Sequence, residues 1–104
     1  MTARPIPMAL DRFAGMIGGA REFLRIWAKS DGAVVCFVDP VPVGPDPVTF
    51  GEVLADCARH AAKAYAQAVH IGEDEALARI WQGFDAGRAA KDNDPITFTT
   101  VERR

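Results

Sequence analysis

The residues best suited to chemistry gather in one stretch of the chain, Thr49–Ala68, which contains Asp56, Cys57, His60 and Tyr65. In a helix, Asp56 and His60 would lie one turn apart, so the carboxylate could accept a hydrogen bond from the imidazole. Such a bond fixes the tautomer of a histidine and raises its basicity, as in a general base or a metal ligand. The alternative is a structural histidine, half-buried at the edge of the core and held there by Asp56.

A metal site or a nucleophilic cysteine has weaker support. Cys57 and His60 are three residues apart, but a zinc site needs three or four ligands. The other soft ligands, Cys36 and His70, have no spacing that would bring them close to this pair. Glu52 could join Asp56 and His60, but as a carboxylate it would suit only a harder ion. A nucleophilic thiol must be exposed, and we expect both cysteines to be buried structural thiols. We therefore predict no catalytic residues and no metal ligands.

A binding site is the remaining possibility for this stretch. Our candidate ligand-binding residues are Asp56, Arg59, His60 and Tyr65. Arg59 and Lys63 share the polar face of the expected helix, and they could bind an anion together with Arg21, Arg25 and Arg79 if the helices converge. A solvated charged face is the alternative.

The same stretch has strong structural signals. Thr49 and Glu52 form the pattern of a capping box, with Val48 and Val53 placed as a hydrophobic staple. At 100° per residue, one face forms a stripe that we expect to meet the core: Val53, Leu54, Cys57, Ala61, Ala64, Tyr65 and Ala68. A second face carries Ala58, Ala62 and Ala66, which either admit another helix closely or lie on a solvated surface.

Two further helices are expected. Apolar residues at helical spacing predict one from about Gly19 to Lys29, which ends at the Asp31-Gly32 turn signal. A second spans 73–90, with acidic residues in its first turn and a Glu75–Arg79 pair one turn apart. We expect Trp27 and Trp81 to pack in the core.

The run Ala33–Val38, AVVCFV, predicts a buried strand, because it is apolar, β-branched and bounded by turn signals. Residues 40–47 carry four prolines and are expected to form a stiff loop rather than a paired strand. Residues 96–101, ITFTTV, have strand composition and could pair with the buried strand, as could a second copy of the chain.

The composition indicates a single globular domain over residues 1–104, with residues 1–10 and 91–104 less ordered. The net charge of −2 provides no basic surface for nucleic acid. No apolar run approaches the roughly 18 residues that a membrane span needs, and the first residues do not form a secretory signal. With two widely spaced cysteines, we expect a reduced, cytoplasmic protein without a cofactor.

Several segments resemble a bacterial family known as domain of unknown function 5076. They are REFLRIWA at 21–28, LADCARHAAKAYAQ at 54–67 and LARIWQGFDAG at 77–87, with Leu54, Asp56, Arg59 and His60 forming the most specific part. The family usually has a tryptophan where this chain has Phe50, and a different tail. The resemblance spans about residues 18–87 and implies a compact α+β bacterial protein with no assigned reaction.

We therefore expect an α+β fold in which three helices pack on a small sheet. That sheet would consist of one buried strand and a short or intermolecular partner strand. Because the core is small and the strand has few partners, we predict a homodimer. The leading hypothesis for function is a non-catalytic domain that associates with itself or with a partner. The alternative is a small-molecule or metal-binding protein, possibly enzymatic, with its site at Asp56 and His60.

Overall fold

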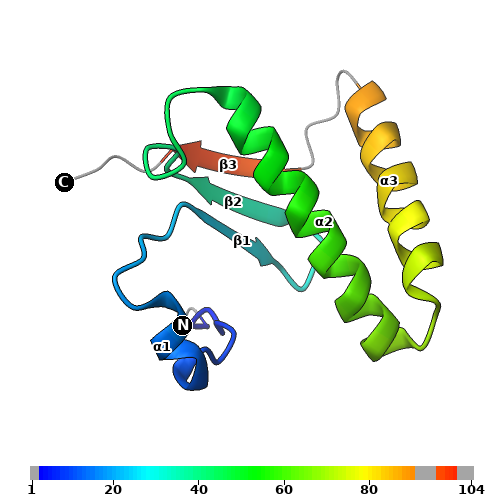
Figure 1. Cartoon of the computed structure of the whole chain (residues 1–104), viewed down its shortest axis with the longest axis horizontal. Helices are drawn as coiled ribbons and strands as arrows, with labels where there is room; N and C mark the ends of the chain where they lie inside the picture. Colours follow the sequence, from blue (N-terminus) through cyan, green and yellow to red (C-terminus); the bar gives the residue numbers. More distant parts are fainter. Residues whose placement is uncertain (1–2, 91–95, 101–104) are drawn as a thin grey trace.

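The computed structural model describes residues 3–90 and the backbone of residues 96–100. The elements follow the order η1 (Asp11–Phe13), α1 (Ala14–Ile17), β1 (Leu24–Ala28), β2 (Val34–Val38), α2 (Pro47–Val69), α3 (Glu73–Ala89) and β3 (Ile96–Thr100). Three α-helices and a small sheet confirm the α+β class (Figure 1). We expected less order in residues 1–10 and 91–104. Of these, residues 1–2, 91–95 and 101–104 lie outside the described residues.

The sheet has three strands in the order β1-β2-β3. β1 and β2 are antiparallel, with Ile26 opposite Cys36, and β2 and β3 are parallel, with Cys36 opposite Phe98. A parallel pair needs a long crossover, which α2 and α3 supply between β2 and β3 (Figure 1). The strand predicted at 33–38 is confirmed, and so is its pairing with the segment that begins at residue 96.

The helix predicted from Gly19 to Lys29 is wrong, because residues 24–28 form β1 instead. The Asp31-Gly32 pair does not end a helix; it turns a β-hairpin. Gly32 has a φ of 91°, which favours glycine, and Asp31 Oδ1 accepts a hydrogen bond from the Ala33 N–H at 2.9 Å. Once the turn brings the two segments together, pairing with β2 outweighs the helical spacing of the apolar residues. Trp27 therefore lies half-buried in a strand.

Helix α2 begins earlier than its sequence pattern predicts. Asp46, rather than Thr49, is the N-cap, and its Oδ1 accepts a hydrogen bond from the Val48 N–H at 3.0 Å. Pro47 occupies the first turn, where a missing N–H costs nothing. The capping box that we expected at Thr49 is therefore already inside the helix. The helix ends at Val69, with His70 in the left-handed conformation, and Gly72 is the N-cap of α3.

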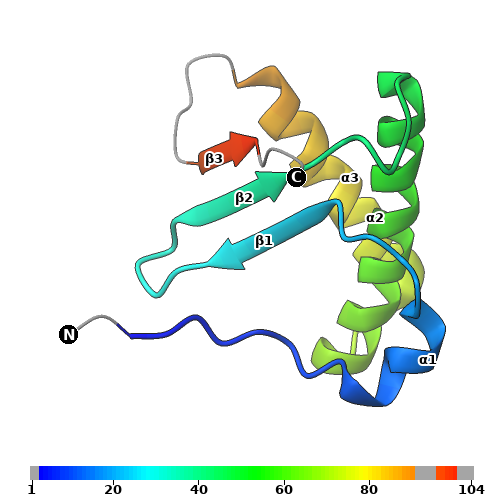
Figure 2. The same ribbon diagram turned by 90° about the vertical axis from the view of Figure 1, so that its left-hand side faces the viewer.

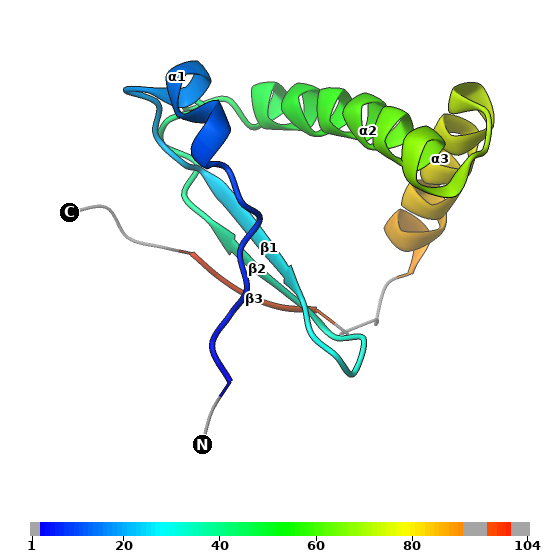
Figure 3. The ribbon, with the colours of Figure 1, turned by 90° about the horizontal axis from the view of Figure 1, so that it is seen from below.

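Helices α2 and α3 pack side by side through small residues (Figures 1 and 3). Ala62 of α2 and Ala76 of α3 are 1% and 2% exposed, and they are the only buried residues among the side chains that the structure describes. Small side chains let two helix backbones approach closely. Of the two possibilities left open for the Ala58, Ala62 and Ala66 face, the structure selects contact with another helix.

The stripe expected to meet the core is only partly covered. Val53, Leu54 and Ala61 are half-buried, whereas the stripe's remaining residues, Cys57, Ala64, Tyr65 and Ala68, are exposed. Near its start, α2 meets the hairpin through an edge-to-face contact of Phe50 with Phe23, whose ring centroids are 6.1 Å apart. Farther along, the sheet diverges from α2, as Figure 3 shows, which leaves the second half of the stripe uncovered.

Candidate functional site

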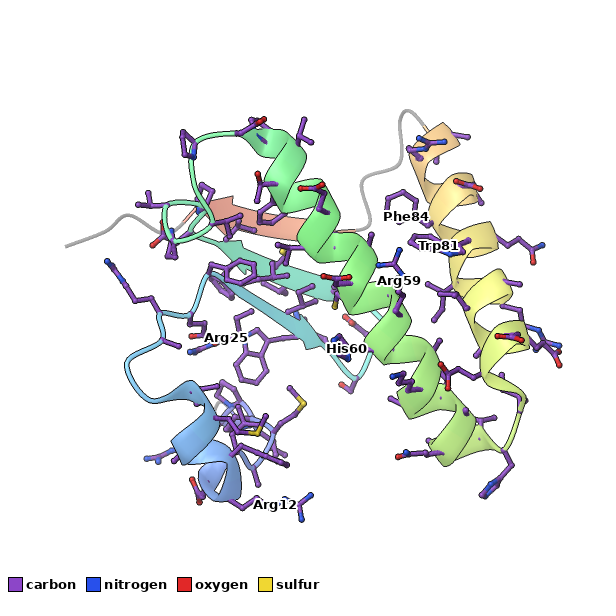
Figure 4. All side chains as sticks on the ribbon, in the orientation of Figure 1. Arg12, Arg25, Arg59, His60, Trp81 and Phe84 are labelled. Carbon is purple, nitrogen blue, oxygen red and sulfur yellow. The ribbon has the colours of Figure 1, made fainter. Side chains whose placement is uncertain are left out.

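The pair expected between Asp56 and His60 is replaced by another. Asp56 Oδ1 accepts a hydrogen bond from Arg59 Nη1 at 2.8 Å, and both side chains are exposed. Figure 4 shows Arg59 on the side of α2 that faces α3, and His60 on the side toward the strands. His60 is exposed rather than half-buried, so its expected place at the edge of the core is wrong. A guanidinium and a carboxylate form a charge-assisted hydrogen bond, which is stronger than one between neutral groups, so Arg59 is a favourable partner for Asp56.

The other candidates on α2 do not converge with these residues into an enclosed site. Tyr65 is 53% exposed, and Cys57 is exposed and free rather than buried. The burial predicted for Cys57 is wrong because the sheet does not follow α2 along its length. Cys36 in β2 is half-buried. Neither His60 nor Tyr65 lines the main groove of the molecule, which lies along β1.

Three of the four arginines expected to bind an anion form separate local ion pairs. Arg79 binds Glu75 at 2.5 Å, which confirms that predicted pair, and Arg25 Nε donates to Glu22 Oε2 at 3.0 Å. The hydrogen bond that the Arg25 guanidinium donates to Glu22 and the negative charge of Glu22 raise the pKa of Arg25. Because Arg25, Arg59 and Arg79 are each paired with a carboxylate three or four residues away in the chain, the solvated charged face is the better description.

Replacement of His60 by alanine is expected to change the free energy of unfolding by no more than about 0.5 kcal/mol, because the side chain is exposed. Urea unfolding at a fixed protein concentration measures this change. A loss of about 1–2 kcal/mol would instead indicate a buried hydrogen bond to the imidazole.

Among the described residues, no group of three or more His, Cys, Asp and Glu side chains is placed to hold a metal ion. In the same part of the chain, no helix has the length and apolar character needed to cross a membrane.

A groove of about 950 Å³ lies between β1 and the extended N-terminal segment. Trp27, Val35 and Phe37 contribute apolar side chains to it, and Pro5 and Ile6 form its far wall. Charged residues of both signs also line it: Arg4, Glu22, Arg25, Lys29 and Asp39. Figures 2 and 3 show that the N-terminal segment passes the free edge of β1 and extends away from α2 and α3.

The sequence did not predict this groove, because the helical spacing of its apolar residues placed β1 in a helix. In a strand, Arg25 and Trp27 share one face, and their partners in the register, Phe37 and Val35, lie on that same face. The signal that could have found it is the Asp31-Gly32 pair between two apolar runs, which is typical of a hairpin.

Comparison with known proteins identifies the family of this fold. A family model described as Domain of unknown function (DUF5076) matches residues 5–91. The chain belongs to this family. The match confirms the resemblance and extends it to the N-terminal segment from residue 5, η1 and α1. β3 lies beyond the matched residues.

One solved structure is similar to this chain over most of its length. It is named "Structure of a putative pyruvate dehydrogenase from the photosynthetic bacterium Rhodopseudomonas palustrus CGA009". The two chains are 32% identical, and the alignment covers 86% of this chain and 100% of the other, with a TM-score of 0.60. A search of curated proteins found no match.

Proposed function

We propose that this member of the family is a non-catalytic domain that functions as a homodimer. The observation that supports this most strongly is its exposed surface. The chain exposes 9132 Å², whereas a compact monomer of 11.2 kDa is expected to expose about 5,700 Å². A standard interface covers about 800 Å² on each partner, so the chain could cover an interface of this size and still expose as much surface as a compact monomer.

The apolar character of part of the exposed surface also supports association. Six large apolar residues between Ile6 and Ile17 are exposed: Ile6, Met8, Leu10, Phe13, Met16 and Ile17. So many exposed large apolar residues in one short segment are uncommon on a monomer and are typical of an interaction surface. Since this segment falls within the family match, its apolar residues are part of the domain.

A cytoplasmic, bacterial setting is part of the proposal. Cys36 and Cys57 are both free, as is usual in a reducing compartment, and the relative with a solved structure comes from a bacterium.

The alternative site at Asp56 and His60 lacks comparable support, because Asp56 is paired with Arg59 and neither Asp56 nor His60 lines the groove. The name of the relative would assign an oxidation of pyruvate to this chain, and the geometry gives that assignment no support. Cys57 and His60, which could act as nucleophile and base, are exposed on α2, away from the residues that line the groove.

Light scattering coupled to size-exclusion chromatography tests the proposal. At tens of micromolar, we expect a single species of twice the 11.2 kDa chain mass. A species of 11.2 kDa at that concentration would contradict the proposal.

A further inference from the structure

The outer edge of β1 has no hydrogen-bonding partner among the described residues. β1 is the first strand of the sheet, and its ladder is formed with β2 on the other side. No backbone hydrogen bond joins this outer edge to another described segment. Natural edge strands are commonly protected by prolines, bulges or several charges. β1, with the sequence LRIWA, has neither a proline nor a charge other than Arg25.

The groove runs beside this edge and over one face of the hairpin. Arg25 and Trp27 of β1 line it together with their partners Phe37 and Val35, which share that face of the sheet. Ile26, in the middle of β1, does not line the groove and is 56% exposed. A free strand edge of this kind can accept an extended chain that continues the sheet, which is the usual mode of strand addition.

We propose that β1 pairs with β1 of a second copy in antiparallel orientation, so that two three-stranded sheets become one sheet of six strands. In this dimer the second copy takes the place beside the edge of β1 that residues 3–6 occupy in the single chain. This inference rests on the proposed homodimer and names its interface. The area that the chain exposes beyond that of a compact monomer is larger than such a contact would cover. The charges beside the groove are of both signs, which suits a patch that must meet its own copy, whereas a nucleic acid would need one sign.

The pattern of residues also selects the register. A two-fold axis perpendicular to the sheet leaves each side chain on the same face of the sheet in both copies. Residues that pair across the two strands must share a face, so the axis lies level with one residue rather than between two residues. Centring the pair on Ile26 aligns all five residues of both strands. Centring it on Arg25 or Trp27 aligns only three, and centring it on Leu24 or Ala28 aligns one.

Charge and exposure favour the same centre. An axis at Arg25 places two arginines side by side, and an axis at Trp27 places Arg25 opposite Lys29 of the second copy, so both bring like charges together. An axis at Ile26 places Arg25 opposite Trp27 of the second copy, where a cation–π contact is favourable. It also joins the two Ile26 side chains, each 56% exposed in the single chain, in one apolar contact.

Substitutions at Ile26 test this interface by light scattering and analytical ultracentrifugation of the full chain. Ile26→Lys would place two ammonium groups together at the axis, and we expect the dimer dissociation constant to rise at least ~100-fold. Ile26→Thr keeps a β-branched strand former without a charge, and we expect it to remain a dimer. Val48→Lys is the matched control, since Val48 is 67% exposed but lies on α2, and we expect it to remain a dimer.

Cysteine cross-linking tests the register independently of any effect on folding. Cys36 lies opposite Ile26 in the hairpin, so the background carries Cys36→Ala and Cys57→Ala. In this background we expect Ile26→Cys to form a covalent dimer on mild oxidation, because opposed residues of a strand pair have the spacing that a disulfide needs. We expect Val48→Cys to form none.

The possible outcomes separate this inference from the proposed function. If the wild-type chain is a dimer but Ile26→Lys is also a dimer and Ile26→Cys does not cross-link, the β1 interface is wrong and the homodimer stands. If the wild-type chain is a monomer at tens of micromolar, the homodimer is wrong and the interface with it. Circular dichroism of Ile26→Lys distinguishes a folded monomer, which supports the interface, from an unfolded chain, in which case the cross-linking result decides.

Discussion

Ala62→Leu is expected to lower the free energy of unfolding by about 1–3 kcal/mol, because the α2–α3 contact has no room for a larger side chain. Ala62 is 1% exposed and faces the neighbouring helix, whose own buried residue is also an alanine. Three extra carbon atoms would push the two helices apart or force strained rotamers. Urea unfolding at one fixed protein concentration measures the effect, since the stability of a dimer depends on concentration.

Ala64→Leu is the matched control for this prediction. Ala64 lies two residues away on the stripe that the sequence assigns to the core, yet the structure leaves it exposed. Both alanine and leucine are good helix formers, so we expect a change within about 0.5 kcal/mol. If Ala64→Leu were the more damaging of the two substitutions, the helix would have the orientation predicted from the hydrophobic stripe, and the packing described above would be wrong.

Phe50→Ala is expected to cost about 2 kcal/mol, roughly half the usual loss for a fully buried phenylalanine, because the side chain is half-buried. Its ring packs edge-to-face against Phe23, with an interplanar angle of 79°. This contact joins the start of α2 to the residue just before β1, so it helps to hold the long helix against the sheet. Thermal or urea unfolding of the variant provides the measurement.

A double-mutant cycle separates the ring contact from the loss of apolar area. Combining Phe50→Ala with Phe23→Ala should give a coupling free energy of about 1 kcal/mol. Phe84→Ala is the control, because Phe84 makes a similar contact with Trp81, at 5.9 Å, but within a single helix and with half of its surface exposed. We expect that substitution to cost less than Phe50→Ala. Additive effects at Phe23 and Phe50 would show that the two rings do not hold α2 to the hairpin.

The elements that the sequence predicts well are those with strong local signals. The helix expected at 73–90 forms as Glu73–Ala89, with three acidic residues in its first turn. The strand expected at 33–38 forms as Val34–Val38. In both cases the hydrophobic period, the flanking turn residues and the charges favour the same structure. No other segment has to be present for these signals to act.

The candidate site shows the limit of such reasoning. Asp56 has two possible partners about one turn away, Arg59 and His60, and the spacing allows both. The structure pairs it with Arg59. It also leaves His60 exposed, because the sheet turns away from α2 before reaching that part of the helix (Figure 3). Burial of a helix face depends on what lies against it, and the position of the sheet is not encoded in the helix.

The amino-acid sequence by itself determined the α+β class, the family, the long helix, α3 and the central strand, because local periodicity and turn chemistry are sufficient for each. Only the tertiary structure decided that residues 24–28 form a strand, that the alanine face of α2 rather than its hydrophobic stripe meets α3, and that a groove follows the edge of β1. Each of these depends on which segments meet in space. Hydrogen bonds between strands and close packing between helices exist only after that meeting, so they can override the preference of a segment considered alone.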